Sequence, residues 1–245
     1  MTTPSDYSNR DEYRCQVASD LICWRTQYKE TELYICADCL LEQEANDAVV
    51  SLRQILDHYI LHHESFAKSF VPVRAASDAP SVIADMCSGA MSAGVGPMAA
   101  VAGAFAAHVG QALLEHTSQV IVENGGDVFI KTKKQRTVAI FAGKSPVSMK
   151  IGIAIDTSER AISVCTSSGT VGHSFSFGKA DAAVVVSHDA CLADACATRL
   201  GNDIKHVSDI QNALETIYGI DGVLGAVAVM GGTCGAIGNI HLTPL

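Results

Sequence analysis

An aspartate and a threonine four residues apart are the first groups in this sequence that could carry chemistry. They lie in Ala193-Asp-Ala-Cys-Ala-Thr198, inside a segment whose pattern predicts a helix over Leu192–Leu200. Residues four apart share a helix face, so Asp194 and Thr198 could offer two hard oxygens to Mg²⁺, with water or a substrate phosphate completing the shell. Without context, the pattern favours a plainer interpretation, a threonine bonded to its own backbone and an aspartate near a helix start.

A long loop rich in hydroxyls and glycines precedes that helix. It runs through Thr166-Ser-Ser-Gly-Thr-Val-Gly-His-Ser174 to Gly178-Lys-Ala-Asp181, between two predicted strands. It is not a Walker A loop, because His173 stands where that motif requires a glycine five residues before Gly178. Long irregular loops are more often functional than simple connections, so a ligand-binding role is favoured over a flexible surface loop.

Two further glycine-containing segments could approach a ligand. Gly94-Val-Gly-Pro-Met-Ala99 fits G-x-G-x-x-A and leads into a helix, but the residues before it look helical, whereas a dinucleotide fingerprint needs a strand there. A helix–helix turn is therefore favoured, and an anion site at this helix start stays open. Glu123-Asn-Gly-Gly-Asp127 alone favours an ordinary hairpin turn, although its two acidic residues also suit a polar site.

Cysteine usage indicates free thiols. The chain has nine cysteines, an odd number, and its first 20 residues are polar without the apolar core of a secretory signal. We therefore expect a reducing cytoplasm and no intrachain disulfide. Cys36 and Cys39 lack a second pair at zinc spacing, so structural zinc is disfavoured, as is redox use. His58, His62 and His63 have metal-compatible spacing, but a solvated helix face is the favoured interpretation.

Composition limits the function classes. The chain has 245 residues, 48% hydrophobic, with a net charge of −9 and 6% aromatic residues. This excludes a disordered chain and argues against nucleic-acid binding, which needs clustered Lys and Arg. No Asp, Glu, Lys or Arg occurs between Met86 and Leu114, but this Ala/Gly-rich stretch is broken by Gly94-Val-Gly-Pro97. A packed core is therefore favoured over a membrane span.

The elements that must position these groups are mixed. The pattern predicts a polar arm over residues 1–21 and a single domain over 22–245. Helices fall in pairs between runs of strands, which favours a layered α+β domain. Helices are expected at residues 45–63, 80–91, 97–115, 192–200 and 207–218. Strands are expected at residues 22–28, 32–37, 119–122, 128–131, 137–141, 149–155, 161–165, 182–187, 223–230 and 239–242, with Gly231–Gly238 as a glycine-rich turn.

The order of the motifs resembles the ApbE superfamily of flavin transferases. The match is closer to a small ApbE-like branch of anaerobic bacteria and archaea, and covers most of residues 22–240. It rests on residues 94–103, 123–127, 166–174, 177–181 and 193–198, a set that is specific although each piece alone is not.

The resemblance implies a T-fold-like α+β architecture, FAD or a related phosphate-bearing ligand, and Mg²⁺ on the diphosphate held by Asp194 and Thr198. It makes His173 and Asp127 the candidate catalytic residues. Candidate ligand-binding residues are Gly94, Gly96, Pro97, Met98, Asn124, Gly125, Gly126, Thr166, Ser167, Ser168, Gly169 and Thr170. Residues 96–98, 125–127 and 166–169, with His173 and Asp194, are expected to converge on one cleft. A protein acceptor is implied, and a homodimer is left open.

Two functions from different classes remain. One is a Mg²⁺-dependent FMN transferase, favoured by the Asp194/Thr198 pair and the intact glycine loops. The other is an accessory protein of sulfur-amino-acid formation, a sulfide-dependent route to homocysteine with which the resembling branch is linked. A related third option is a family member kept only as an interaction module. The accessory protein and the interaction module are both favoured by a departure from the transferase motif. The transferases carry His-x-x-Asp-Pro, whereas Ser174 follows His173 here and no Asp-Pro occurs.

Overall fold

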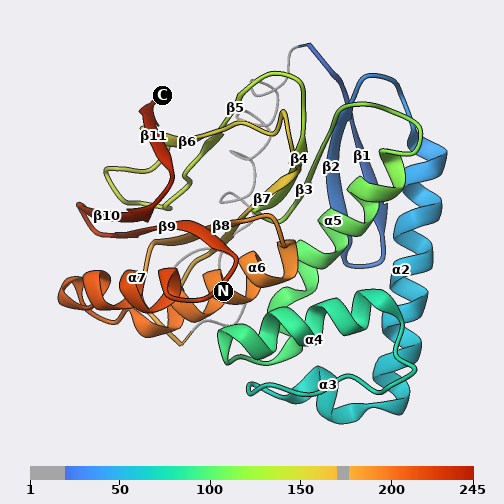
Figure 1. Ribbon diagram of the computed structural model, residues 1–245, viewed down its shortest axis with the longest axis horizontal. Helices are drawn as coiled ribbons and strands as arrows, with labels where there is room; N and C mark the ends of the chain where they lie inside the picture. The colour runs from blue at the N-terminus through green and yellow to red at the C-terminus, as the bar shows by residue number, and fades with distance from the viewer. Residues whose placement is uncertain (1–19, 170–176) are drawn as a thin grey trace.

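One long antiparallel sheet organises the molecule (Figure 1). The computed structural model describes residues 20–169 and 177–245. Eight strands follow the order β1-β2-β3-β4-β7-β8-β9-β10, and a smaller sheet has the order β11-β6-β5. The strands are β1 (Ile22–Tyr28), β2 (Thr31–Ala37), β3 (Val120–Asn124), β4 (Asp127–Lys131), β5 (Arg136–Ala139), β6 (Ile151–Ile155), β7 (Ile162–Ser167), β8 (Ala182–Ser187), β9 (Val223–Met230), β10 (Thr233–Gly238) and β11 (His241–Pro244).

Helices cover one face of the large sheet. Helix α2 packs on β1, α5 on β3 and β4, α6 on β7 and β8, and α7 on β9 and β10. Helix α4 lies outside these, against α6. The helices are α2 (Glu42–His62), α3 (Glu64–Lys68), α4 (Ser81–Ala93), α5 (Val101–Leu113), α6 (Ala190–Asp203) and α7 (Ile210–Tyr218), with short 3₁₀ turns η2 (Pro97–Ala100) and η3 (Val207–Asp209).

Side-chain alternation builds a core on each face of the sheet. On β8, Ala183 and Val185 pack with the helices, whereas Val184 and Val186 pack toward the small sheet, against a core that includes Ile153. Successive strand residues point to opposite faces, so a strand covered on both sides needs a continuous apolar run. This explains why the sequence of β8 is an unbroken apolar run. The molecule therefore has three layers: the helices, the large sheet and the small sheet.

Helix α6 is the buried centre of the helical layer. The Asp189 side chain caps it by accepting the Leu192 N–H at 3.1 Å. The helix contacts α4, α5, β7 and β8, and most of its residues are buried. Its small side chains, such as Ala193 and Ala197, allow this close packing on several sides at once.

The predicted elements agree with the structure except for the short helix α3, which the sequence pattern did not predict, and the region near the C-terminus. The strands at Ala182–Ser187 and Val223–Met230 are confirmed, and the mixed layered α+β class is correct. The glycine-rich turn predicted at Gly231–Gly238 is wrong, because only Gly231 and Gly232 turn and the rest is β10, paired with β9. Gly235 suits this strand because a Cβ would lie 2.7 Å from the Ile210 side chain, so α7 fills that space instead.

The uncharged stretch between Met86 and Leu114 forms core helices. Helix α4 and the Pro97–Leu113 segment meet at an angle of 105°. Within the described part of the chain, no single helix has both the length and the apolar character to cross a bilayer. The cytoplasmic location stays a prediction.

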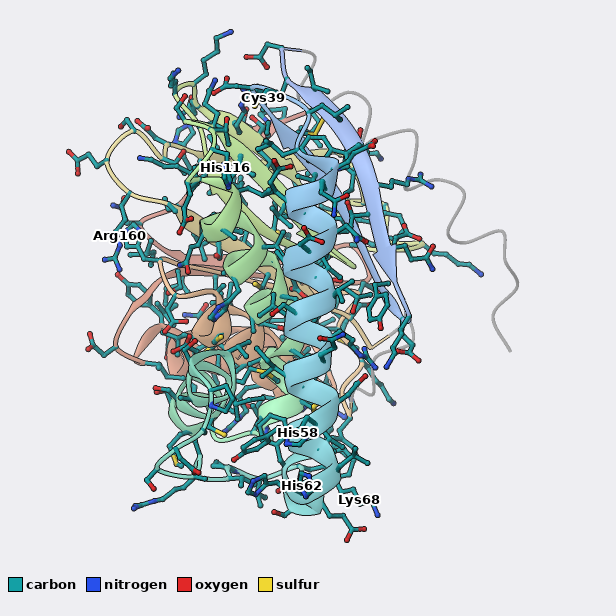
Figure 2. All side chains as sticks on the ribbon, turned by 90° about the vertical axis from the view of Figure 1, so that its right-hand side faces the viewer. Cys39, His58, His62, Lys68, His116 and Arg160 are labelled. Carbon is teal, nitrogen blue, oxygen red and sulfur yellow. A yellow bond between two sulfur atoms is a disulfide. The ribbon has the colours of Figure 1, made fainter. Side chains whose placement is uncertain are left out.

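Two cysteines on the β1–β2 hairpin correct the expectation of free thiols throughout. Cys23 and Cys36 are cross-strand partners with Cα atoms 4.1 Å apart, and a disulfide joins them. An antiparallel pair without mutual hydrogen bonds brings Cα atoms this close. An odd cysteine count excludes complete pairing but cannot exclude one register-determined pair. Cys39 is free and exposed at the N-terminal end of α2, opposite the end that carries His58 and His62 (Figure 2).

We expect the denatured protein to show two fewer reactive thiols before reduction than after it. The β1–β2 register holds the two sulfur atoms together, so the bond forms whenever the folded chain meets an oxidant. Alkylation followed by peptide mass spectrometry should recover Cys23 and Cys36 in one linked species. Cys36→Ser should remove the difference and Cys39→Ser should keep it; an equal thiol count before and after reduction in the unsubstituted protein would contradict the pairing.

Candidate functional site

A buried carboxylate on α6 is the centre of the candidate site. Asp194 is only 8% exposed, although the helix around it is apolar. Its Oδ2 accepts the Gly103 N–H at 2.8 Å, in the first turn of α5. The first backbone N–H groups of a helix have no partner within it and favour a negative charge. Asp194 therefore caps α5 from a helix 91 residues away in the chain.

Gly103 makes this contact possible. A Cβ on Gly103 would lie 2.6 Å from the Ala190 carbonyl oxygen and 2.9 Å from the Asp194 Cβ. Only a glycine therefore lets the start of α5 approach α6 this closely. Sequence reasoning included Gly103 in the family motif but gave it no role in the site, because a glycine inside a helix signals packing only when the partner helix is known.

The second carboxylate comes from the β3–β4 hairpin. Asp127, the first residue of β4, is 6% exposed, and its Oδ1 accepts the Thr166 N–H of β7 at 3.0 Å. The turn before it holds the start of α5, since the Asn124 side chain donates to the Ala102 carbonyl oxygen at 3.1 Å. Gly125 adopts a positive φ of 65°, which suits a residue without a Cβ.

The environment of Asp194 disfavours its charged form. Burial raises the pKa of the Asp194 carboxyl well above its usual value, and the charge of Asp127 adds to the rise, while hydrogen bonds from the Gly103 and Ala102 backbone oppose it. Burial and the same two carboxylates also raise the pKa of the Cys165 thiol, whose Sγ lies 3.7 Å from the Ala190 carbonyl oxygen. Asp127, Asp194 and Cys165 thus form one buried group, which we call the carboxylate cluster.

The Gly94–Met98 segment borders this cluster through η2, which packs on α6. Gly94 ends α4 with a left-handed φ of 73° beside the Arg199 guanidinium. Gly96 faces protein, because a Cβ there would lie 1.8 Å from the Ser69 carbonyl oxygen. Pro97 is buried and Met98 half-buried. The Gly103 N–H in the first turn of α5 is bonded to the Asp194 carboxylate. The anion site that the sequence left open at this helix start stays a hypothesis.

The ends of the β7–β8 loop are held together. The Gly169 N–H donates to the Ala180 carbonyl oxygen at 2.9 Å, and a Cβ on Gly169 would lie 2.5 Å from the Gly178 carbonyl oxygen. Ser167 ends β7 beside Gly201 of α6, and Ser168 follows it. Thr170 and His173 lie outside the described residues, so their predicted roles stay predictions.

The structure therefore brings together four of the predicted segments. Hydrogen bonds or charge link four residues around the start of α5: Asn124, Asp127, Thr166 and Asp194. A Cβ built on Gly126 would lie 3.8 Å from the Thr166 carbonyl oxygen. Thr198 is half-buried one helical turn beyond Asp194. Gly94 and Gly96 lie at the margin and contact other parts of the protein. The ligand and catalytic roles of all these residues stay predictions.

No larger metal-type cluster accompanies them. Across residues 20–169 and 177–245, His, Cys, Asp and Glu side chains form no group of three or more arranged to hold a metal ion. The rings of His58 and His62 meet edge to face near the end of α2, with their centroids 4.7 Å apart and His62 exposed (Figure 2). Any metal at the carboxylate cluster would therefore depend on few protein ligands.

Comparison with known sequences gives consistent matches over most of the chain. A family model described as AbpE bacteria matches residues 15–234. The UPF0280 protein of Methanococcus aeolicus is 40% identical over 201 residues, covering 80% of this chain and 81% of that protein. The UPF0280 protein of Methanococcoides burtonii is 39% identical over 218 residues, covering 87% and 91%.

Comparison with solved structures gives the same architecture at low sequence identity. The apo flavinyl transferase ApbE of Pseudomonas stutzeri superposes with a TM-score of 0.56 at 12% identity, covering 89% of this chain and 93% of that one. The ApbE protein of Thermotoga maritima gives a TM-score of 0.55 at 14% identity, covering 88% and 96%. At such identities the likeness concerns the fold.

Proposed function

We propose a ligand for this chain, which belongs to the AbpE bacteria family. Its carboxylate cluster binds the diphosphate of FAD or a related nucleotide together with Mg²⁺. The observation that carries the proposal is the meeting of Asp127 and Asp194, two buried carboxylates from distant segments, beside the first turn of α5. Two buried like charges are costly unless a cation or a proton compensates them. A ligand that brings a cation would relieve that cost.

The donor set fits Mg²⁺. This ion prefers carboxylate oxygens, binds through one or two of them, and takes its remaining ligands from water and substrate phosphate. Asp194 would supply a carboxylate, and Thr198 a neutral hydroxyl one turn along α6. When bound, the ion would neutralise charge on the diphosphate, which an acidic protein would otherwise repel.

The reaction that we propose is FMN transfer. A hydroxyl oxygen of a protein acceptor would attack the FMN phosphorus of FAD, the diphosphate bond would break, and AMP would leave. The hydroxyl proton would pass to a base, for which His173 and Asp127 are the candidates. Asp127 is held for such a role by the Thr166 N–H, which fixes one carboxylate oxygen at 3.0 Å. The flavinyl transferase name of the Pseudomonas stutzeri protein supports this reaction class.

A second candidate is an accessory protein of sulfur-amino-acid formation that binds a phosphate-bearing ligand without transferring it. The observation that favours it is the sequence after His173, which lacks the transferases' His-x-x-Asp-Pro. The carboxylate cluster would then serve ligand binding alone.

Incubation of the purified protein with FAD and Mg²⁺ separates the two candidates. We expect AMP release that requires Mg²⁺, measured by chromatography, together with tight FAD binding measured by calorimetry. Asp127→Asn should reduce AMP release by at least about tenfold, since it removes the charge and the candidate base. The exposed Asp156→Asn is the matched control and should leave both readouts unchanged. FAD binding without AMP release would support the accessory role, and absence of both FAD binding and AMP release would contradict the transferase.

A further inference from the structure

Two phenylalanines lie exposed beside each other although they are far apart in the chain. Phe70, in the segment after α3, is 65% exposed, and Phe177, before β8, is 56% exposed. Their ring centroids are 5.4 Å apart and their planes meet at 76°. This is the edge-to-face geometry of an interacting pair. Large aromatic side chains usually lose most of their exposure on folding, so an exposed pair requires an explanation.

The backbone on each side of this aromatic pair is firmly positioned. The Ser69 carbonyl packs against Gly96, where no Cβ would fit. The Phe177 N–H donates to the Asn202 Oδ1 at 2.8 Å, and the next residue, Gly178, packs on the Gly201 carbonyl, 1.7 Å from where a Cβ would stand. The pair therefore joins two segments, around Gly96 and around Gly178, that the sequence motifs marked for ligand binding.

Helix α6 connects the aromatic pair to the carboxylate cluster. Asp194, Thr198 and Asn202 occupy positions i, i+4 and i+8 of this helix, so they form one stripe on one face. The stripe begins at the buried carboxylate and ends at the amide that holds Phe177. Eight residues of helix span about 12 Å. A nucleotide has the same layout, with its phosphates and its planar ring separated by a sugar or a sugar-alcohol chain.

We propose that Phe70 and Phe177 recognise the planar ring of the ligand whose phosphates bind at the carboxylate cluster. This inference rests on the proposed function and adds the ring as the feature that the protein selects. A ring stacked on one phenylalanine and bordered by the edge of the other would cover apolar surface that is now exposed to water. Every aromatic ring system offers a face for such stacking, so isoalloxazine and adenine share this chemistry.

Calorimetric titration with four probes tests the proposal: FAD, FMN, ADP and pyrophosphate, each with Mg²⁺. We expect Phe177→Ala and Phe70→Ala each to weaken binding of the preferred ring compound by roughly tenfold, the size of one stacking contact. Pyrophosphate, which has no ring, should bind the variants and the unsubstituted protein equally. Phe177→Tyr should restore the affinity because it keeps the ring. The matched control is Leu61→Ala, which removes an exposed apolar side chain elsewhere, on α2.

The probes also identify the ring and separate the two proposals. A loss for FMN but not ADP would assign isoalloxazine to the aromatic pair, and the reverse would assign adenine. Unchanged FAD, FMN and ADP affinities in both alanine variants would overturn the inference while leaving the proposed function intact. An equal loss for pyrophosphate would also overturn it, because the effect would then not concern a ring. An unsubstituted protein that binds none of the four probes would overturn the proposed function, and the inference with it.

Discussion

Replacing Asp194 with asparagine is expected to abolish the mutual enhancement of Mg²⁺ and diphosphate binding. In the unsubstituted protein, Mg²⁺ should tighten ADP or FAD by roughly tenfold, within the usual range for coupled ligands, and the ligand must tighten Mg²⁺ by the same factor. Asparagine keeps the shape and an acceptor for the Gly103 N–H but removes the charge. Titration of ADP with and without Mg²⁺ measures the coupling. Equal enhancement in both proteins would remove Asp194 from the site.

The same variant has a distinct effect on stability that shows whether it folds. Because the pKa of the folded Asp194 carboxyl is raised, the folded chain keeps a proton that the unfolded chain releases. The stability contributed by this carboxyl is fully present below its unfolded pKa and is lost as pH rises through the folded pKa. Without Mg²⁺, the melting temperature of Asp194→Asn minus that of the unsubstituted protein should therefore increase as pH rises from about 4. Asp156→Asn should not gain in this way, because hydrogen bonds from Ser158 lower the pKa of the Asp156 carboxyl and so give its removal the opposite sign.

Replacing Gly103 with alanine is expected to lower both stability and metal–ligand coupling. Overpacking against the Ala190 carbonyl should cost about 2–3 kcal/mol, which outweighs the gain of about 1 kcal/mol from replacing a helical glycine with alanine. The net loss of about 1–2 kcal/mol should lower the melting temperature by about 2–8 °C. The added methyl group also pushes α5 from α6 and so lengthens the hydrogen bond to Asp194. Thermal unfolding followed by circular dichroism measures the first effect, and calorimetry the second.

Gly232→Ala is the matched control for this substitution. A Cβ there would have only the Pro146 side chain nearby, at an ordinary contact distance of 3.8 Å. Its effect on unfolding should stay within about 0.5 kcal/mol, and the coupling should not change. A melting temperature of Gly103→Ala equal to or above that of the unsubstituted protein would show that the two helices do not approach as closely as described.

Local sequence determined most elements of the fold. The amphipathic spacing that ends near His63 predicts α2, which ends at His62, and the apolar run Ala182–Ser187 predicts β8 to the residue. These signals are strong because burial imposes a fixed period on each helix and strand. The β10 strand was missed because its glycines are typical of turns, and only the cover supplied by α7 makes an extended conformation favourable there.

The motifs likewise predicted which residue types belong together, but not how. Sequence resemblance marked Asp127 and Asp194 separately, whereas the fold brings their charges together beside α5 and gives the Gly103 N–H to Asp194. The strand register paired Cys23 with Cys36, a choice that a count of nine cysteines cannot make. The contact between Phe70 and Phe177 left no signal in either segment.

The sequence by itself thus determined the local periodicities and the order of the motifs, because these depend on neighbours within about one helical turn or one strand. The tertiary structure alone decided which carboxylates share a buried space, which cysteines face each other and which aromatic rings meet. Such contacts join residues separated by tens of positions, and their energies depend on burial and distance, which no local pattern encodes.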